Sequence, residues 1–320
     1  MPEILFIAST RIGDAVLCTG ALEHARTLLP GAGLTIACGP LPAPLFRATP
    51  GLRRVHVMAR RPSGAHWFEL WRALRGERFD LAVDLRGSLV TYAFAARRRI
   101  VFRASTRVVR HKVEELSALM GSARPLAPVL HLDARARADA AAALPDGGPT
   151  LVLGAGANLS GKRWRPDQFA AVARRLTGQA GPLSGARIVL LGGPEDKDIA
   201  REIAESLDAD GVAAHDLVDR LDLLACAALL ERATLFIGND SGLMHIAAAM
   251  GAPTLGLFGP TDERVYGPWG PRTRALRGAA LSAVAARAPI RAARHILMDD
   301  LTVDAVEAGA VALLKGGGLA

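Results

Sequence analysis

Short runs of apolar residues alternate along the chain with segments whose apolar side chains recur at helical spacing. The apolar runs of the first half, each predicted as a strand, are Ile4–Ala8, Leu34–Ala37, Val55–Val57, Leu81–Asp84 and Ile100–Phe102. After the first run, residues from Asp14 to Leu29 place apolar side chains near a period of 3.6, and Pro30-Gly31 ends this predicted helix. Strands that alternate with helices in this way indicate a parallel, doubly wound α/β sheet.

The same alternation restarts after Leu144-Pro145-Asp146-Gly147-Gly148-Pro149, because proline and glycine at that density interrupt any helix or strand. The strands predicted in the second half are Thr150–Leu153, Arg187–Leu191, Leu235–Ile237 and Thr254–Leu257. The helices predicted there are Pro166–Leu176, Glu195–Leu207, Asp222–Leu230 and Ser241–Met250. A last amphipathic helix is expected from Thr302, its N-cap, to Leu314.

These patterns predict two Rossmann-like domains that face each other across a cleft. The first domain is expected at 1–146 and the second at 147–300. Residues 301–320 are expected to form a C-terminal helix that packs back toward the first domain. In sheets of this type, ligands bind outside the carboxyl ends of the strands. The loops that follow the strands are therefore the ones to search for chemistry.

The basic residues are concentrated in the first half of the 320-residue chain, whose formal charge is +8. Residues 1–148 contain 21 basic and 12 acidic side chains, and the remainder contain 18 and 19. A basic half suits an anionic partner, such as a nucleic acid, an acidic lipid surface or a phosphorylated glycan, although solvated surface charge is equally compatible. No stacking aromatics interleave with the arginines and the chain has only two tyrosines, so we expect no nucleic-acid partner.

The three cysteines, Cys18, Cys38 and Cys226, lie far apart and match neither a metal-binding nor a redox spacing. We expect each to be a small buried hydrophobic residue, with no metal site and no disulfide, which favours a reducing compartment. The N-terminus lacks the pattern of a signal peptide, and no stretch reaches the roughly 18 apolar residues of a membrane span. The predicted location is therefore the cytoplasm, with room for a peripheral contact with a membrane.

The first loop, Ser9–Asp14, follows the first predicted strand and lacks the G-x-G-x-x-G fingerprint of dinucleotide binding. It places the carboxylate of Asp14 in the first turn of a helix, beside Gly13. One interpretation is an N-cap, because aspartate accepts hydrogen bonds from free backbone N–H groups and stabilises the positive helix end. The other is a general base, which must lie within hydrogen-bond reach of the proton that it removes.

The loop after the first strand of the second domain, Gly154–Trp164, nearly matches a P-loop. Gly156 to Lys162 fits G-x4-G-K, but Arg163 stands where a serine or threonine would hold magnesium. This substitution argues against a nucleotide hydrolase. Small residues that expose N–H groups, together with the point charge of Lys162, still form a suitable phosphate cradle.

Three further loops of the second domain carry candidate ligand contacts. In Gly192–Asp196, Glu195 either caps a helix or accepts hydrogen bonds from a ribose. In Asn239–His245, Gly242 leaves the N–H groups of the first helical turn accessible to a diphosphate, and His245 lies on the same helix face as Ser241, although a lone helical histidine can equally be a core residue. The loop Phe258–Asp262 follows the next strand and borders the same sheet edge.

In this order, the motifs resemble glycosyltransferase family 9, the family of the ADP-heptose:lipopolysaccharide heptosyltransferases. The matching segments, which cover nearly the whole chain, are Arg11–Asp14, Phe79–Leu85, Lys162–Pro166, Gly192–Glu195, Asn239–Gly242 with His245, and Phe258–Thr261. The paired Asp-Ser-Gly-x-x-His and Gly-Pro-Thr segments are the specific part of the resemblance. Many relatives carry a cysteine cluster before the last helix, whereas 287–298 contains no cysteine and ends in His295-Ile296-Leu297-Met298.

The resemblance implies a GT-B fold and an inverting glycosyltransferase that needs no cofactor and no metal. It implies a heptose donor, ADP-heptose, and an anionic glycolipid acceptor such as the lipopolysaccharide inner core. The implied roles are catalytic base for Asp14, donor phosphate contact for Lys162, ribose contact for Glu195, sugar contact for Asp240, and diphosphate contacts for Ser241, Gly242 and His245. A different nucleotide-diphosphate sugar, or sugar-nucleotide binding without catalysis, are the alternatives.

A basic stretch of the first domain is the candidate acceptor-binding surface. Its residues are Arg97, Arg98, Arg99, Arg103, Arg107, Arg110 and Lys112. Of these, Arg97, Arg98, Arg99 and Arg103 are the predicted acceptor contacts. A solvated helix face is the competing interpretation.

Overall fold

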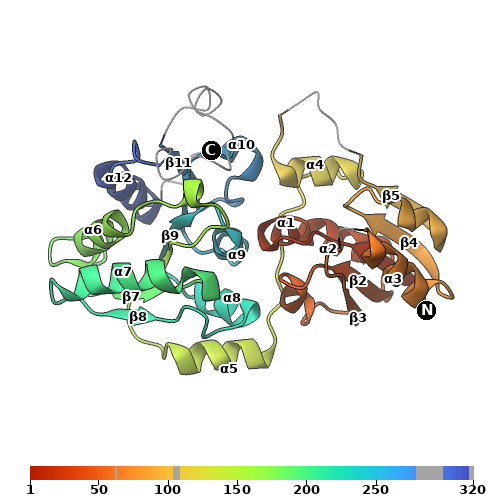
Figure 1. The fold of residues 1–320 in the computed structure, drawn as a ribbon, viewed down its shortest axis with the longest axis horizontal. Coiled ribbons are helices and arrows are strands. Elements are labelled where there is room, and N and C mark those ends of the chain that lie inside the picture. Colours follow the sequence, from red (N-terminus) through yellow and green to blue (C-terminus); the bar gives the residue numbers. More distant parts are fainter. Residues whose placement is uncertain (62, 104–108, 279–297, 317–320) are drawn as a thin grey trace. The chain divides into compact units, whose positions relative to one another are not determined.

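The computed structural model describes residues 1–61, 63–103, 109–278 and 298–316, which form two compact units, Met1–His131 and Leu132–Ala320 (Figure 1). The predicted boundary at 146/147 differs from the observed one, because helix α5 (Ala134–Ala143) packs on α8 (Leu223–Glu231) of the second unit. Arg232 strengthens this contact by donating hydrogen bonds to the carbonyl oxygens of Ala140 and Leu144. The Pro/Gly segment therefore connects α5 to the second sheet and does not separate the domains.

The first unit contains a five-stranded parallel sheet in the order β3-β2-β1-β4-β5. The strands are β1 (Glu3–Ile7), β2 (Gly33–Cys38), β3 (Leu52–Val57), β4 (Arg78–Asp84) and β5 (Ala95–Val101). All five predicted strands are confirmed. The strand order changes direction between β1 and β4, which makes their carboxyl ends the topological switch point of this sheet, the usual place for a ligand.

Helices cover both faces of the first sheet. They are α1 (Ile12–Leu17), α2 (Thr19–Leu28), α3 (Ala65–Leu74) and α4 (Lys112–Leu119), with short 3-10 helices η1 (Ala43–Phe46) and η2 (Leu89–Ala93). The single helix predicted from Asp14 to Leu29 is broken at Cys18. The Thr19 hydroxyl donates to the carbonyl oxygen of Val16 and accepts from the N–H of Val129, and a side chain at Gly20 would collide with the carbonyl oxygen of Leu126. These contacts fix the break.

The second unit contains a six-stranded parallel sheet in the order β11-β10-β9-β6-β7-β8. The strands are β6 (Thr150–Gly154), β7 (Arg187–Leu190), β8 (Ala214–Asp216), β9 (Leu235–Asn239), β10 (Thr254–Phe258) and β11 (Thr273–Arg277). The four predicted strands are confirmed. The two edge strands, β8 and β11, escaped prediction because neither forms an apolar run: they read Ala-His-Asp and Thr-Arg-Ala-Leu-Arg.

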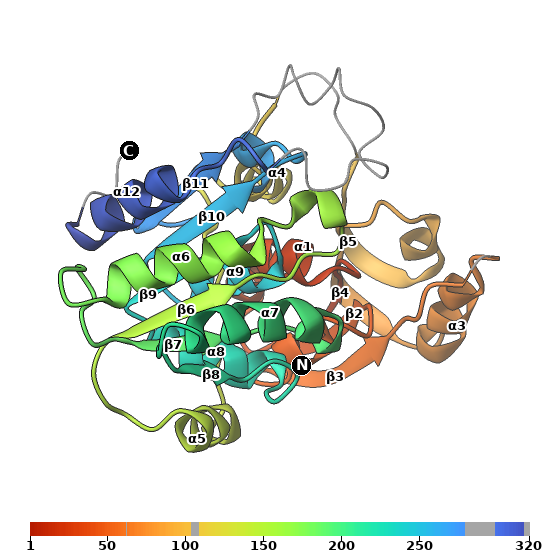
Figure 2. The same ribbon diagram turned by 60° about the vertical axis from the view of Figure 1, so that its left-hand side comes forward.

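Helices cover both faces of the second sheet (Figure 2). Helices α6 (Pro166–Thr177), α7 (Lys197–Asp208) and α12 (Val303–Leu314) lie on the first face, and α8 and α9 (Gly242–Ala249) lie on the second. The remaining helical segments are η3 (Ser160–Lys162), η4 (Pro194–Asp196) and α10 (Glu263–Tyr266). The predicted Thr302 cap of the last helix is confirmed, since its hydroxyl accepts from the N–H of Ala305. That helix packs on α6, β10 and β11 of its own unit.

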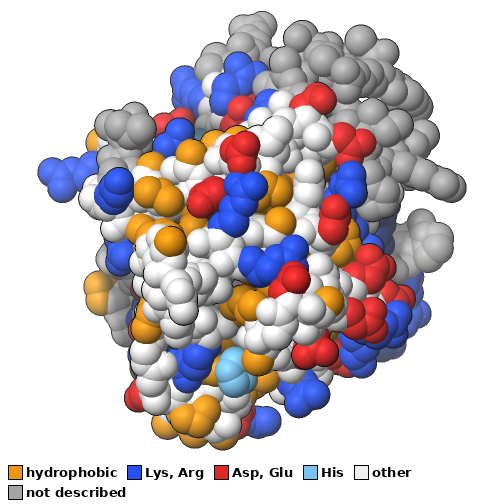
Figure 3. Space-filling view, turned by 90° about the vertical axis from the view of Figure 1, so that its left-hand side faces the viewer, with side chains coloured by type: hydrophobic (Ala, Val, Ile, Leu, Met, Phe, Trp, Pro, Cys, Tyr) orange, Lys and Arg blue, Asp and Glu red, His pale blue; other side chains and the backbone are white. Residues whose placement is uncertain are grey.

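The surfaces of the two units differ in composition. Figure 3 shows the face that α6, α7 and α12 cover, where basic and acidic side chains adjoin one another. Arg175 on this face pairs with both Asp304 and Glu307. By contrast, every exposed large hydrophobic side chain among the described residues belongs to the first unit: Met1, Leu28, Leu41, Val57, Phe68, Leu89, Tyr92, Val109 and Val129. The first unit thus combines the basic excess with the exposed apolar surface.

Candidate functional site

The loops after β6, β7, β9 and β10 meet at the carboxyl edge of the second sheet, where these four strands are neighbours. These loops approach one another so closely that two of their glycine positions have no room for a side chain. A Cβ atom at Gly156 would lie 2.1 Å from an Asp196 carboxylate oxygen, and one at Gly259 would lie 2.9 Å from the carbonyl oxygen of Gly161. Because Cβ atoms essentially never approach other heavy atoms this closely, glycine is required at both positions. The four loops, singled out separately in the sequence, therefore form one site.

Lys162 and Asp240 form the polar centre of this site. The Lys162 ammonium donates to Asp240 Oδ2 at 2.6 Å, and the Thr261 hydroxyl donates to the same oxygen at 2.6 Å. The other carboxylate oxygen of Asp240 lies 4.0 Å from Nε2 of His245. The Lys162 and Asp240 side chains are only 13% and 8% exposed, so the attraction between them is weakly screened by water. Asp240 thus holds the lysine in place, and two of the lysine's three donors remain for a ligand.

Asn239 joins the β9 loop to the β6 loop. Its side chain is fully buried; its oxygen accepts from the N–H of Trp164 at 3.1 Å and its amide nitrogen donates to the carbonyl oxygen of Ala155 at 2.6 Å. The Trp164 indole in turn donates to the carbonyl oxygen of Leu301 and stacks edge-to-face on Phe169. These bonds fix the segment on both sides of Lys162. The lysine lies in η3, and α6 begins only at Pro166, as the P-loop mismatch predicted.

The first turn of α9 supplies backbone donors next to Asp240. Ser241 is the N-cap and makes no side-chain capping bond, and Gly242 begins the helix. Within the described part of the chain, the Ser241 hydroxyl is shielded from solvent and has no hydrogen-bond partner. The N–H groups of a first helical turn also have no partner inside the helix, and the helix dipole makes this end attractive to anions. His245 is 4% exposed and lies one turn further along.

Of the two acids after β7, it is Asp196 that fastens the loop. Its Oδ2 accepts from the N–H of Gly193 at 3.0 Å, and Arg163 lies 3.7 Å from its Oδ1. Burial raises the pKa of Asp196, while the Gly193 hydrogen bond opposes that shift. Glu195 is exposed, and its carboxylate folds back to 2.8 Å from a Cβ built on Gly193. The capping role therefore falls to Asp196, which leaves Glu195 accessible to a ribose.

Three residues that hold the site together, Asn239, Asp196 and Arg277, were not among the predicted site residues. Arg277, on edge strand β11, donates to the carbonyl oxygens of Gly259 and Thr261 and pairs with Glu263. It thereby fixes the β10 loop that presents the Thr261 hydroxyl. The one available signal was the Gly-Asn-Asp string, because an amide directly after a buried strand can bridge neighbouring loops. The partners of Arg277 are 14 to 18 residues away, which no local pattern indicates.

In the first unit, the predicted base lies at the switch point. Asp14 is half-buried and occupies the third position of α1, and its carboxylate lies 3.5 Å from the Ser9 hydroxyl. The N-cap itself is Arg11, which makes no side-chain capping bond. Asp14 is therefore not the N-cap, although its charge still stabilises the positive end of the helix.

The predicted acceptor arginines do not share one environment. Arg99 donates to the carbonyl oxygens of Thr91, Phe94 and Ala96, so its guanidinium holds the β4–β5 connection together. Arg97 pairs with Asp80 and its side chain is 86% exposed. Arg98 and Arg103 are exposed, and Arg107 lies outside the described residues. The region of the missing cysteine cluster, 279–297, also lies outside them.

The cysteines behave as predicted, as buried free thiols. Burial raises the pKa of Cys18, Cys38 and Cys226 to about 12, so none is a thiolate nucleophile near neutral pH. In the described ranges, no group of three or more His, Cys, Asp and Glu residues is arranged to hold a metal ion. No helix within those ranges is both long and apolar enough to cross a membrane.

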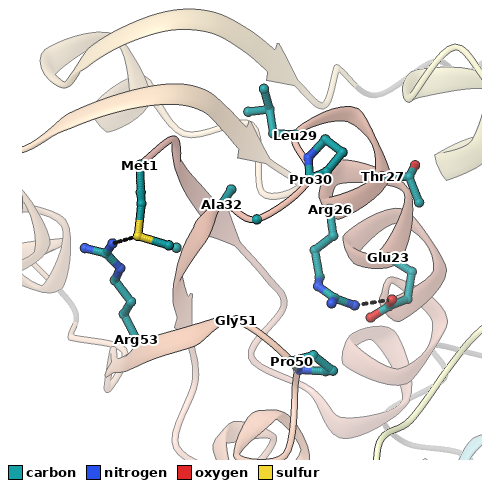
Figure 4. Close-up of a pocket in the computed structure, with 12 residues that line it drawn as sticks. Met1, Glu23, Arg26, Thr27, Leu29, Pro30, Ala32, Pro50, Gly51 and Arg53 are labelled. Carbon is teal, nitrogen blue, oxygen red and sulfur yellow. Dashed lines mark hydrogen bonds and ion pairs between the residues drawn. The ribbon is translucent and has the colours of Figure 1, made fainter.

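A separate hollow of about 630 Å³ lies at the opposite, amino edge of the first sheet (Figure 4). Figure 4 shows the Arg26–Glu23 ion pair on one wall and Arg53 beside Met1 on the other. The hollow is lined partly by backbone and small residues at the turns around Gly31 and Gly51. None of the predicted site residues lines it.

Two doubly wound parallel sheets, one of them with glycine-rich loops at its carboxyl edge, define a two-domain α/β protein of the GT-B fold. Residues 67–288 match the sequence profile of glycosyltransferase family 9 (heptosyltransferase), and the chain belongs to this family. It is 37% identical over 110 residues to lipopolysaccharide heptosyltransferase 3 of Escherichia coli, a match that covers 34% of this chain and 30% of that protein. The matches to the first curated relatives cover 30–32% of the length of those proteins, or about a third.

Solved structures show the same fold over the whole chain. ADP-heptose lipopolysaccharide heptosyltransferase II of E. coli superposes with a TM-score of 0.78 at 21% identity, over 98% of both chains. The family 9 glycosyltransferase from Veillonella parvula superposes with a TM-score of 0.81 at 18% identity, over 98% of this chain and 97% of that one. At these identities the likeness concerns the fold.

Proposed function

We propose that this protein is an inverting glycosyltransferase that moves heptose from ADP-heptose onto an anionic glycolipid acceptor of the lipopolysaccharide inner-core type. Family membership supports transferase activity, and the names of the relatives suggest the donor and the acceptor class. The observation that carries the proposal is the Lys162–Asp240–Thr261 network beside the first turn of α9.

The donor would bind at the carboxyl edge of the second sheet. Its diphosphate would accept from the spare Lys162 donors, from the Ser241 hydroxyl and from the N–H groups at Gly242, with His245 alongside. Glu195 would accept from the ribose hydroxyls. This arrangement would place hydrogen-bond donors and a helix dipole where negative charge grows as the nucleotide diphosphate leaves, and such preorganised groups usually make the largest contribution to catalysis.

The reaction would be a single displacement. Asp14 would remove the proton from an acceptor hydroxyl while that oxygen forms a bond to the anomeric carbon of the donor. The bond from this carbon to the diphosphate oxygen would break at the same time, so the configuration inverts and the nucleotide diphosphate carries away the electron pair. In this scheme a metal is not needed, because the spare Lys162 donors and the dipole of α9 would stabilise the charge of the leaving diphosphate.

Thermal-shift measurements with nucleotide diphosphates test the donor assignment. At a concentration 100 times its Kd, ADP is expected to stabilise the protein by about 2.7 kcal/mol, and UDP and GDP by clearly less. A larger shift with UDP or GDP would identify another nucleotide-diphosphate sugar as donor. If none of the three raised the Tm, the donor-site proposal would be wrong. Turnover with the matching sugar nucleotide then separates an enzyme from a non-catalytic binding protein.

We also propose that the protein works at the cytoplasmic face of the inner membrane, which it contacts through α3 and η2 of the first unit. These two elements pack together, and they expose Phe68 (60%), Leu89 (85%) and Tyr92 (54%). The exposed Arg72 lies on the same helix as Phe68, and the exposed Arg75 is the C-cap of that helix. Apolar side chains with basic ones on the same element suit the surface of an anionic bilayer.

Flotation with phosphatidylglycerol vesicles tests this surface. The double variant Phe68→Ser/Leu89→Ser is expected to lower the vesicle-bound fraction by about 10-fold or more, because each side chain contributes up to about 2 kcal/mol on burial in lipid. The control Leu28→Ser alters another exposed apolar residue, 37% accessible, at the end of α2. Equal binding of the double variant and the control would exclude this face, and binding to neutral phosphatidylcholine as strong as to phosphatidylglycerol would exclude the role of the arginines.

A further inference from the structure

The loop after β4 stands at the switch point of the first sheet, directly beside the β1 loop that carries Asp14. It is held by Asp84, a completely buried carboxylate at the end of β4. Asp84 accepts from the N–H groups of Arg86 and Ser88 at 2.8 and 2.9 Å, and from the hydroxyls of Ser88 and Thr91 at 2.5 and 2.6 Å. Four hydrogen bonds to one carboxylate fix the backbone of the loop, and with it the starting point of the Arg86 side chain.

Arg86 is the residue that this loop presents. Its guanidinium stacks over the Trp67 ring, 4.5 Å from the ring centroid. One of its terminal nitrogens is shielded from solvent and finds no hydrogen-bond partner among the described residues. Burial lowers the pKa of Arg86; the charge of Asp84 opposes this shift and the nearby Arg60 adds to it, and the group remains charged near neutral pH. A buried guanidinium N–H without an acceptor costs free energy that an anionic ligand would recover.

His66 supplies a second donor next to the first. Its side chain is 5% exposed, and its ring lies 5.0 Å from that of Trp67. Nδ1 accepts from the N–H of Arg61 at 3.3 Å, which assigns the proton of the neutral ring to Nε2. Nε2 is buried and has no partner within the described segments. Burial and the charges of Arg86 and Arg60 lower the pKa of His66 against the opposing influence of Glu69, so the ring is neutral near pH 7.

The charges around this cluster favour an anion. Arg60 and Arg86 are the cations that act on His66. The one acid that acts on it, Glu69, is paired with Arg61 at 3.2 Å. Asp84 also acts on Arg86, but the hydrogen bonds of its own loop occupy its carboxylate. Among the described residues, two buried donors without acceptors thus lie around one tryptophan, where Arg60, Arg61 and Arg86 outnumber Glu69 and Asp84. By contrast, the guanidinium of Arg99, in the basic stretch, donates hydrogen bonds to backbone carbonyl oxygens.

We propose that Arg86 and His66 bind an anionic group of the acceptor, a phosphate or a carboxylate, on the tryptophan platform of Trp67. This inference rests on the proposed transferase function, since it assigns the recognition of the acceptor to the sheet edge that carries Asp14. Arg86 would form the charged contact and His66 Nε2–H the neutral one, with Trp67 keeping the guanidinium flat and partly dehydrated. The stretch of Arg97, Arg98 and Arg103 is then left as surface charge.

Titration calorimetry with small anions tests this assignment. Inorganic phosphate and D-glucuronate serve as probes for the two anion chemistries, and D-glucose serves as the neutral control. All titrations use the full chain saturated with ADP, so that phosphate does not enter the donor site. Wild type is expected to bind at least one of the two anions and not glucose. Arg86→Gln is expected to lower that affinity by about 10-fold or more, because a charge-assisted hydrogen bond is lost.

Matched variants make the result specific. Arg201→Gln removes an exposed arginine of α7 that pairs with Asp198, and is expected to leave anion affinity unchanged. His66→Phe keeps the ring contact with Trp67 but removes Nε2–H, and is expected to weaken binding by about 5-fold. If Arg86→Gln does not fold, the anion affinity of His66→Phe decides whether the proposed site exists. Binding of phosphate alone identifies an acceptor phosphate, and binding of glucuronate alone an acceptor carboxylate.

Two results would overturn the inference: no anion binding by wild type up to about 100 mM, or equal affinities in wild type and the Arg86 and His66 variants. In the latter case the buried donors bind only water. Failure of the proposed function looks different, because then ADP itself does not bind. In that case the titrations are repeated without ADP, in the Lys162→Met background so that the anions do not bind to this lysine. The glucuronate affinities of Lys162→Met and Lys162→Met/Arg86→Gln then decide the inference.

Discussion

Replacing Asp14 with asparagine is expected to lower turnover by about 100-fold or more, while the affinity for ADP stays unchanged. Asparagine has nearly the same shape but cannot take a proton, and general-base catalysis typically contributes 100- to 10,000-fold. The measurement is the initial rate of transfer from ADP-heptose to an inner-core acceptor, with ADP affinity determined in parallel.

The structure makes a purely structural explanation of that loss testable. Asp14 is the third residue of α1 and not its N-cap, so its helix-dipole contribution is at most about 1 kcal/mol. The free energy of unfolding of Asp14→Asn should therefore fall by less than that. Asp139→Asn, which removes an exposed carboxylate of α5 that pairs with Arg135, is a control expected to retain full turnover. Turnover by Asp14→Asn within a few-fold of wild type would exclude Asp14 as the base.

The fold could be predicted because its central strands are buried on both faces and therefore read as apolar runs. Strands such as β1 and β9 are recognisable from the sequence for this reason. Edge strands β8 and β11 carry charged or polar residues, and their positions follow from pairing with a neighbouring strand and not from their own pattern. The domain boundary was misplaced for a similar reason: α5 belongs to the second unit through its contact with α8, 80 to 97 residues away in sequence.

The candidate site was predictable where a single loop carries its own signal. Lys162, Asp240 and Ser241 each follow a predicted strand, and parallel strands bring such loops to one edge. The sequence could not show which of two adjacent residues stabilises the loop and which faces outward. Asp196 and Glu195 are adjacent acids, yet only Asp196 is turned inward onto Gly193. Arg86 was not selected either. Its guanidinium is a buried donor without an acceptor among the described residues, and this is a property of the folded chain that no sequence pattern indicates.

The buried pair of Lys162 and Asp240 gives the donor site its charge balance. With both present, the two charges cancel and the remaining lysine donors and α9 dipole attract the diphosphate. Without the lysine, Asp240 would be a carboxylate, 8% exposed, whose remaining polar neighbours among the described residues are Thr261 and His245. Removing one partner of a buried ion pair leaves an uncompensated charge, which costs more than the lost contact itself. The sign of the site would change from neutral to negative, facing a negative ligand.

Lys162→Met is therefore expected to lower ADP affinity by about 100-fold, or roughly 2.7 kcal/mol, as measured by titration calorimetry. The double variant Lys162→Met/Asp240→Asn removes the uncompensated carboxylate and should recover about 10-fold of that loss, even though it carries one more substitution. Lys197→Met, which breaks the exposed pair with Asp219, is the matched control and should bind ADP like wild type. If the double variant bound ADP no better than Lys162→Met, the charge of Asp240 would not be acting on the diphosphate, and Lys162 would contribute only its own contacts.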